Sequence, residues 1–441
     1  MGLTRSLSTG ASSLRAHQQR FDVISNNLAN ANTIGFKNNK ATFQEQFNQI
    51  YSYGKSPDTT TGTGNAGGVN PLQFGLGVKM GAINQDFSQG VIENTNRPLD
   101  LALQGDGFFI FNHNGSDNYS RAGSVTRDKD GFFVDTASGA YLQGYNVQRN
   151  ENGSIVKDSN GINQLTGLQE NMQVADDVLS SPRQTQNISL WGNLNSSNPE
   201  GTEKHTSIKI FDQLGNDHEL KFTFTKTANA NEYSLAAQVD GQDLNVSENT
   251  ITFNNDGTLN SPLDLLISAA DLNTAIGTDV FNAADATDIS VSMSDPDNLL
   301  SGLTQLAGQN QASFKQQDGF QAGQLQSLEV DEQGRILGSF TNGQTELMGQ
   351  TLIARFTNNE GLVRKGDNFY AQSPNSGAAS VGTAGDLFAS TKIIGYGLEQ
   401  SNVDMTVEFT EMISTQRAFE AASRIISVSD QLLGETTGLK R

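Results

Sequence analysis

The chain has 441 residues, of which 35% are apolar and 45 are glycine, and its formal net charge is −20. The lack of cysteine excludes disulfides and thiolate metal sites, and the acidic charge disfavours nucleic acid or an anionic membrane as a partner. No run of 18 apolar residues occurs, so the sequence predicts no membrane insertion.

The first element is a helix predicted over 1–34. Apolar residues recur there from Leu3 to Ala31 at alternating steps of four and three, the spacing of a coiled-coil seam. Gly10 and His17 interrupt the seam. The asparagines and the glycine between 30 and 35 end the helix, because both residue types accept left-handed backbone angles. The segment lacks the apolar core of a secretory signal peptide.

After a linker or extended arm predicted over 35–74, the pattern changes to short alternating strands. Asp or Asn stands ahead of Gly in several turns, as in "DKDGFF" at 128–133 and "NNDGTL" at 254–259, which is typical of β-hairpins. The interior is therefore predicted to be mainly β, with one domain inserted into another. We expect a discontinuous β domain of 75–148 plus 318–391, and an inserted outer β domain of 149–317.

The last element is a second helix, placed within 392–441. Its apolar positions run from Met405 to Leu433 with the same steps, interrupted at Gln416, Ser423 and Asp430. The sequence Ser401-Asn402-Val403-Asp404 reads as a capping box, with Ser401 as N-cap and Asp404 three residues later.

Each terminal helix has one apolar side and needs a partner, because isolated helices draw little stability from propensity alone. Docking on the β body would favour a broad apolar stripe, whereas the narrow seam favours another helix. We therefore favour helix pairing. Whether the helices pair within one molecule or between copies stays open at this point.

Patterns that carry catalysis or metal binding are not found. The four histidines have no metal-ligand spacing, and "DKDG" at 128–131 has Phe132 where a calcium loop needs an oxygen ligand. There is no nucleophile elbow and no phosphate-binding loop. The sequence predicts no enzyme, no cofactor, no metal and no catalytic residue.

The two ends resemble the axial proteins of the bacterial flagellum, the rod and hook family. At the N-terminus the resemblance rests on "NNLAN" at 26–30, followed by Thr33 and Gly35-Phe36-Lys37. At the C-terminus it rests on "SNVD" at 401–404, Glu408 and "MISTQRAF" at 412–419. The sequence departs from the family at Ala421-Ala422, where members often carry an Asn.

This resemblance implies mainly β central domains, with the two terminal helices forming a coiled-coil-like inner layer of a tube. The long acidic insertion resembles the outer domain of hook members, whereas rod members are much shorter. The distal rod protein is the alternative, and a secreted β-rich adhesin or binding protein is a more remote one. A hook subunit would polymerise into a flexible tube that transmits torque from rod to filament.

The implied partners are further copies of the chain, the distal rod protein, the hook–filament junction protein, the hook cap and hook-length control proteins, and the flagellar type III export apparatus. The implied location is the hook of the basal body, reached without a cleaved signal peptide. The candidate assembly residues are Leu3, Leu7, Leu14, Phe21, Ile24, Leu28, Asn27, Asn30, Met405, Phe409, Met412, Ile413, Gln416, Phe419 and Ile426. The candidate junction residues are Gly35, Phe36, Lys37, Ser401, Asn402 and Asp404.

Overall fold

The computed structural model describes residues 2–57, 67–150, 155–158, 161–281, 288–294 and 302–438, without the side chains of residues 2–4. The chain forms two compact units. Unit 1 consists of 1–175, 328–337 and 347–441, and unit 2 of 176–327 and 338–346. The five-part division expected from the sequence follows other boundaries and stays a prediction.

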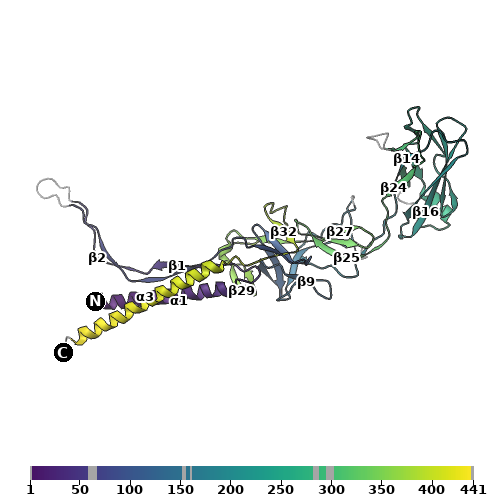
Figure 1. The fold of residues 1–441 in the computed structure, drawn as a ribbon. Coiled ribbons are helices and arrows are strands. Elements are labelled where there is room, and N and C mark those ends of the chain that lie inside the picture. The colour runs from purple at the N-terminus through teal and green to yellow at the C-terminus, as the bar shows by residue number, and fades with distance from the viewer. Residues whose placement is uncertain are drawn as a thin grey trace. The chain divides into compact units, whose positions relative to one another are not determined.

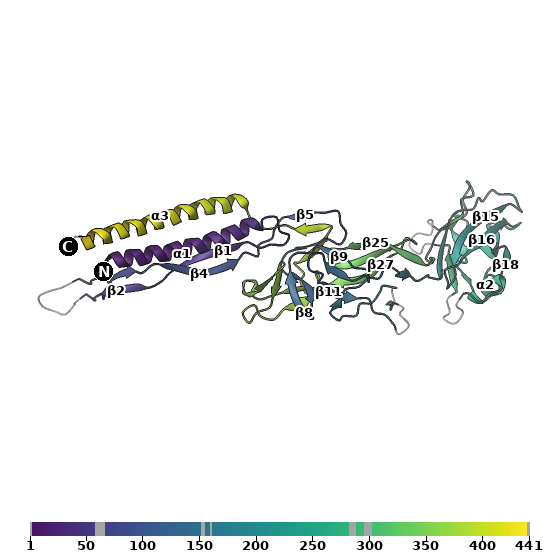
Figure 2. The same ribbon diagram turned by 90° about the horizontal axis from the view of Figure 1, so that it is seen from below.

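Unit 1 contains both long helices, α1 (Gly2–Ala29) and α3 (Met405–Gly438), which lie antiparallel and side by side (Figures 1 and 2). An antiparallel β-ribbon follows α1: β1 (Asn39–Glu45) pairs with β4 (Val78–Gln85), and β2 (Asn48–Ser52) pairs with β3 (Leu72–Gly75). The predicted boundary between the linker (35–74) and the first β domain (from 75) therefore falls inside this ribbon.

The asparagines at the end of α1 supply hydrogen bonds to its last turn. The Asn30 side-chain amide donates to the Asn26 carbonyl at 2.9 Å, and the Thr33 hydroxyl donates to Asn30 Oδ1 at 3.1 Å. Gly35 then turns the chain with a φ of 69°. The helix ends near these residues, as predicted. The Asn30 side chain bonds to a backbone carbonyl of the last turn, and Gly35 adopts the left-handed angle that turns the chain away.

The N-cap of α3 differs from the predicted one. Asp404 Oδ1 accepts hydrogen bonds from the backbone N–H groups of Thr406 and Val407, at 2.8 and 3.3 Å. Asp404 is thus the N-cap, and the prediction of Ser401 in that role was wrong. Ser401 instead accepts from Val403 N in the approach to the helix, because Asn402 is held by the body of unit 1.

The β body of unit 1 is built around β7, which pairs with β8, β11 and β28. Phe108 and Ile110 of β7 are fully buried and share one cluster with Leu352, Phe356 and Tyr370. The remaining elements of this body are β5 (Ile92–Asn94), β6 (Leu101–Gln104), β7 (Phe108–His113), β8 (Ser116–Ser120), β9 (Val125–Arg127), β10 (Phe133–Asp135), β11 (Tyr141–Asn146), β12 (Glu170–Asn171), β28 (Ile353–Arg355), the 3-10 turn η1 (Asn359–Gly361), β29 (Val363–Gly366), β30 (Phe369–Ala371), β31 (Ser380–Gly382), β32 (Lys392–Gly395) and β33 (Gly397–Glu399).

Unit 2 has a core formed by two sheets. Alternate residues of β16, Leu220, Phe222 and Phe224, are fully buried and join Ile188 and Leu190 of β14 in one cluster, as period-two patterning requires. The elements of unit 2 are β13 (Leu179–Ser180), β14 (Asn187–Asn193), β15 (Glu203–Phe211), β16 (Asp217–Lys226), β17 (Glu232–Val239), β18 (Gln242–Leu244), β19 (Thr250–Phe253), β20 (Leu259–Ser261), β21 (Asp264–Ile267), α2 (Ala269–Ile276), β22 (Ile289–Ser292), β23 (Leu303–Thr304) and β24 (Ser313–Gln317). Strands β25 (Gly323–Val330), β26 (Arg335–Phe340) and β27 (Thr345–Thr351) divide between the units.

The mainly β interior with one long helix at each end is the fold class that the sequence predicted, and it is confirmed. Among the described residues, no helix is both long and apolar enough to cross a membrane.

Candidate assembly surface and helix junction

The contact between α1 and α3 is made by small and polar side chains. The buried residues of α3 are Glu408, Thr415, Ala422 and Ser429, each seven positions from the next. On α1, Gly10 lies against α3 so closely that an added Cβ would be 3.0 Å from Ile426 Cγ1. The seven-residue spacing keeps one narrow face of α3 on its partner, and the small residues let the two backbones approach.

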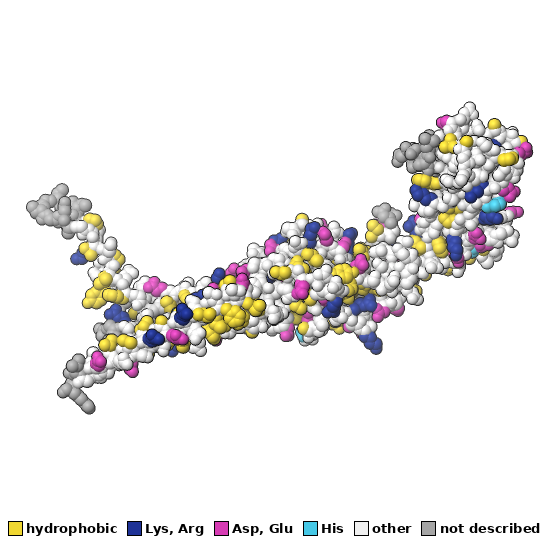
Figure 3. Space-filling view, in the orientation of Figure 1, with side chains coloured by type: hydrophobic (Ala, Val, Ile, Leu, Met, Phe, Trp, Pro, Cys, Tyr) yellow, Lys and Arg dark blue, Asp and Glu magenta, His cyan; other side chains and the backbone are white. Residues whose placement is uncertain are grey.

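Most of the large apolar residues of α3 are exposed or half-buried. Met405, Phe409, Ile413 and Phe419 are 42–53% exposed, whereas Met412 and Ile426 are half-buried. Four further exposed residues of the same helix are not among the candidate assembly residues. These are Val407, Ile425, Val428 and Leu432. Figure 3 shows hydrophobic side chains along the helix pair and near the β2 end of the ribbon.

The candidate residues of α1 divide between its two sides. Ile24 and Asn27 are buried, Leu14, Leu28 and Asn30 are half-buried, and Leu7 and Phe21 are exposed. The side chain of Leu3 lies outside the described residues, and Gln416 of α3 is exposed. The structure therefore gathers part of the predicted set inside the helix pair and leaves most of its large apolar members on the surface.

Asn27 connects the end of α1 to the start of α3 and to the ribbon. Its side-chain amide donates to Asn38 Oδ1, to the Asn39 carbonyl and to Glu408 Oε1, at 2.6, 2.8 and 3.2 Å. Its Oδ1 accepts from Asn39 N at 3.0 Å. Buried to 1% exposure, Asn27 thus fixes the register of three segments at once, as a satisfied buried amide does in coiled coils.

Asn402 makes a similar connection from the C-terminal side. Its Oδ1 accepts from Asn38 N at 2.8 Å, and its amide donates to the Asp86 carbonyl at 2.8 Å and to Ser88 Oγ at 3.1 Å. The backbone before α3 is thereby attached to the segments that begin and end the ribbon. The candidate junction residues on both sides of the chain meet here.

Beneath this amide cluster lies a buried ion network. Lys37 Nζ donates to Glu399 Oε1 at 2.7 Å and to the Ser88 carbonyl at 2.7 Å, and Arg121 Nη1 lies 3.4 Å from Glu399 Oε2. The side chains of Lys37 and Glu399 are fully buried, and that of Arg121 is 2% exposed. Burial lowers the pKa of Lys37 and that of Arg121, and the Glu399 carboxylate opposes both shifts.

Of these three residues the sequence predicted only Lys37. Glu399 also accepts from Gly90 N at 2.8 Å, and its backbone carbonyl accepts from Gly35 N at 2.8 Å. It therefore holds the N-terminal turn, the ribbon base and the β body together. The position of Glu399, two residues before "SNVD", was the only signal in the sequence for its role. The burial of a charged side chain cannot be read from one sequence.

The Gly35-Phe36-Lys37 turn is packed tightly against the β body. Phe36 is 6% exposed, and the Arg364 guanidinium lies over its ring at 4.9 Å while donating to the Lys37 carbonyl at 2.7 Å. A Cβ on Gly35 would lie 2.6 Å from Ala122 N. Only glycine meets both the left-handed angle and the space at this position.

Replacing Gly35 with Ala is expected to destabilise unit 1 by more than the roughly 1–2 kcal/mol that a left-handed L-residue costs, because the added methyl also meets backbone. Chemical unfolding followed by circular dichroism measures this. Gly139→Ala is the control, since Gly139 has a φ of 69° too but nothing within 4 Å of its added Cβ. Equal losses in both variants would show that the close packing at Gly35 contributes nothing.

Glu408 gives the helix junction a dependence on pH. Burial raises the pKa of Glu408 above its ordinary 4.5, Glu411 adds to the rise, and the amides of Asn27 and Asn38 oppose it. Its Oε2 has no hydrogen-bond partner. Because the folded state binds this proton more tightly than the unfolded state, its stabilising contribution is complete below pH 4.5 and is lost as pH rises through the raised pKa.

In Glu408→Gln this part of the pH dependence is expected to disappear. Thermal unfolding of both proteins from pH 4 to pH 7, followed by helix circular dichroism, measures it. The wild-type midpoint should fall relative to that of Glu408→Gln as pH rises. Parallel pH profiles for the two proteins would contradict the assignment to Glu408.

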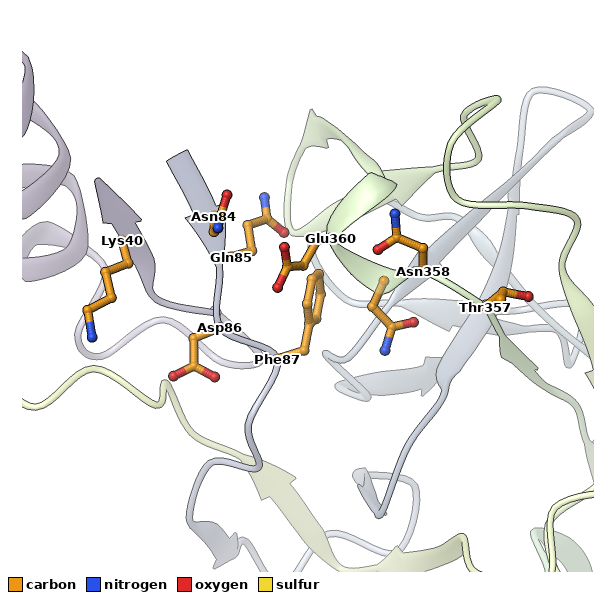
Figure 4. Close-up of a pocket in the computed structure, with 9 residues that line it drawn as sticks. Lys40, Asn84, Gln85, Asp86, Phe87, Thr357, Asn358 and Glu360 are labelled. Atoms are coloured by element: carbon orange, nitrogen blue, oxygen red, sulfur yellow. The ribbon is translucent and has the colours of Figure 1, made fainter. Parts of the chain in front are cut away.

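An open cleft of about 460 Å³ lies at the base of the ribbon (Figure 4). Lys40 and Asp86 line it from the ribbon side, and Asn358 and Glu360 line it from the β body. Its lining carries charges of both signs and amides, but no nucleophile–base pair among the labelled side chains. Within the described residues, no group of three or more His, Cys, Asp or Glu side chains could hold a metal ion.

Comparison with known proteins places these features in a family. Models of three families match the chain: the flagellar basal body protein FlaE D2 domain over 179–320, the flagellar basal body rod FlgEFG protein C-terminal region over 396–439, and the flagella basal body rod protein over 7–37. The two terminal matches include the helix junction, and the first falls on unit 2.

Similar proteins extend over the whole length. The flagellar hook protein FlgE of Borreliella burgdorferi is 31% identical over 99% of this chain and 100% of its own. That of Escherichia coli is 33% identical over 98% and 99%. The crystal structure of Helicobacter pylori FlgE2 covers 70% of this chain with a TM-score of 0.49 and 14% identity, so the assignment rests on the sequences. The resemblance inferred from the terminal motifs is confirmed, and the chain belongs to the flagellar hook protein family.

Proposed function

We propose that this chain is the structural subunit of a flagellar hook, which polymerises into a flexible tube and transmits torque from the rod to the filament. The observation that carries the proposal is the exposed apolar surface of α3. Eight large apolar side chains of this helix are exposed, while its buried positions are small or polar. Exposed apolar surface of this extent is typical of an interaction site.

Coverage by further copies accounts for this surface best. A helix pair held by Thr415, Ala422 and Ser429 buries little apolar area, whereas ordering about sixty helical residues costs roughly 1–2 kcal/mol each in backbone entropy. Contacts with several neighbouring copies would add to the stabilisation of the pair. We infer that the candidate assembly residues act there, and that the helices form the inner layer of the tube.

The proposed mechanical role needs one stiff part and one part that can bend. The buried network of Lys37, Glu399 and Arg121 is a stiff connection between the helices and the β body, which suits torsional load. Contacts between β units of neighbouring copies are expected to be polar and to shift in register, which permits bending. We also propose the division into 1–34, 35–74, 75–148 plus 318–391, 149–317 and 392–441 as the mechanical parts of the subunit.

The proposed partners are those of a hook subunit: the distal rod protein, the hook–filament junction protein, the hook cap, the length-control protein and the type III export apparatus. Export without a cleaved signal peptide is part of this proposal, as is a role without enzymatic activity. Family membership supports each of them. Nucleic acid does not fit the net charge of −20.

Electron microscopy of basal bodies tests the proposal. In a bacterium whose own gene for this chain is deleted, we expect complete rods without hooks, and hooks should return when the chain is supplied. Truncated rods would instead assign the chain to the distal rod. Intact hooks in the deletion strain would contradict both assignments.

A further inference from the structure

Among the described residues, the outer half of the ribbon has few contacts with the rest of its own chain. We define the distal ribbon as residues 46–57 and 67–76, which contain β2 and β3. Every residue of β2 and β3 is exposed, so neither face of these two strands is covered. Phe47, Tyr51 and Tyr53 are 70%, 75% and 77% exposed. A two-stranded hairpin is marginally stable in water, and three large aromatic side chains in solvent make it an incomplete structure.

The inner half of the same ribbon, β1 and β4, packs on α1. The ring of Phe43 on β1 contacts the His17 ring edge-on at 5.5 Å, and the Arg20 guanidinium lies 5.9 Å from its centroid. The Ser12 hydroxyl accepts from Val78 N at 3.3 Å. An aromatic side chain of the ribbon therefore already packs on a terminal helix. The distal ribbon continues from this interface toward the start of α1 (Figure 2).

Phe74 of the distal ribbon contacts α1. The Arg5 guanidinium of α1 lies 5.2 Å from the Phe74 centroid, and the Tyr51 ring lies edge-on to the Phe74 ring with the two centroids 6.3 Å apart. Phe74 and Ile425 of the chain's own α3 line one open groove of about 530 Å³. The chain's own α3 thus leaves space beside the ribbon rather than closing on it.

Charge favours α3 over α1 as the partner. Lys55 is the only charged residue of the distal ribbon, and the whole ribbon over 39–57 and 67–85 has three Lys and one Glu, or +2. Residues 405–438 have two Arg and five acidic residues, or −3. The α1 segment is itself basic, with Arg5, Arg15 and Arg20 against Asp22. Of the two terminal helices, only α3 combines a net negative charge with exposed apolar side chains.

We propose that the distal ribbon of one copy packs on exposed apolar side chains of α3 in a second copy, with Tyr51 and Tyr53 as its main contacts. This rests on the proposed function, because it names the partner surface of the assembling helix. The contact is heterologous, since a ribbon meets a helix rather than another ribbon. Contacts of this kind generate rings or open helical filaments instead of closed dimers.

Photo-crosslinking in assembled hooks tests the proposal. The full chain, with benzoylphenylalanine in place of Tyr51, is expressed in cells that lack their own hook subunit, and isolated hooks are irradiated. We expect crosslinked dimers in which the peptide joined to residue 51 comes from 405–438. The matched control places the crosslinker at Val363, an exposed residue of β29, and should give no dimer with α3.

A second measurement uses Tyr51→Ser with Tyr53→Ser. Hooks should be lost, while the denaturant midpoint of the purified monomer stays unchanged because both side chains are exposed. Val363→Ser should leave hooks intact. Hooks that form but crosslink residue 51 only within one chain, to unit 2 or to a different protein overturn this inference alone. Failure of the unmodified chain to build hooks overturns the proposed function and this inference with it.

Discussion

Glu399→Gln is expected to lower the free energy of unfolding of unit 1 by about 3–5 kcal/mol, the cost typical of removing one partner from a buried ion pair. The substitution keeps the shape of the side chain but removes the negative charge between Lys37 and Arg121. Both cations are fully or almost fully buried, so each would then be desolvated without a counter-charge. The amide oxygen of the glutamine can still accept the hydrogen bond from Gly90 N. The change in stability therefore reports mainly the loss of the charge.

Urea unfolding of the purified monomer measures this loss, with circular dichroism reporting both units and the two transitions separated by their midpoints. Glu332→Gln is the matched control, because Glu332 pairs with Lys392 at 2.6 Å but its side chain is 72% exposed. Exposed pairs contribute little, so the control should unfold like the wild type. A Glu399→Gln midpoint equal to that of Glu332→Gln would refute the structural role of the network.

Serine in place of Phe409, Ile413, Ile425 and Val428 together is expected to abolish assembly. These four side chains are about half exposed. Burying such a side chain completely is worth about 1.5–3 kcal/mol, so covering the exposed halves of all four is worth roughly 3–6 kcal/mol per subunit. Losing that amount weakens association by about 100-fold or more.

The helix itself should survive this change, because Phe, Ile, Val and Ser have similar helix propensities. Hook formation is scored by electron microscopy, and the monomer by its denaturant midpoint. The control replaces four exposed leucines of unit 2 with Ser: Leu214, Leu263, Leu266 and Leu306. If the control variant loses hooks and the α3 variant keeps them, the assembly surface lies on unit 2 instead.

Periodicity predicted the elements of the fold better than their contacts. The seams near Leu14 and Phe409 and the Asp/Asn-Gly turns gave helices at both ends and strands between them, because these patterns are local. The face that α3 turns to α1 could not be read from the same seam. Small residues such as Ala422 and Ser429 allow close approach, and that advantage depends on what stands opposite, here Gly10.

The junction was predicted in part for a similar reason. Gly35 and Asn27 belong to a motif whose composition already indicates a tight turn and a helix end. Glu399 and Arg121 look like ordinary surface charges in the sequence, and only the three-dimensional packing buries them together. The N-cap of α3 is Asp404 rather than the predicted Ser401. The difference arises because Asn402 is hydrogen-bonded to Asn38, 364 positions earlier in the chain.

The distance along the chain between Lys37 and Glu399 has a consequence for the order of folding. These ion-pair partners are 362 positions apart, so closing their loop carries a large entropic cost. In a chain that emerges N-terminus first, unit 2 has nearly all its contacts available before Glu399 appears. The Lys37 ammonium stays hydrated until that carboxylate arrives. The final segment thus sets the time at which the junction closes, and the subunit becomes competent to join a polymer only after the rest of its chain is out.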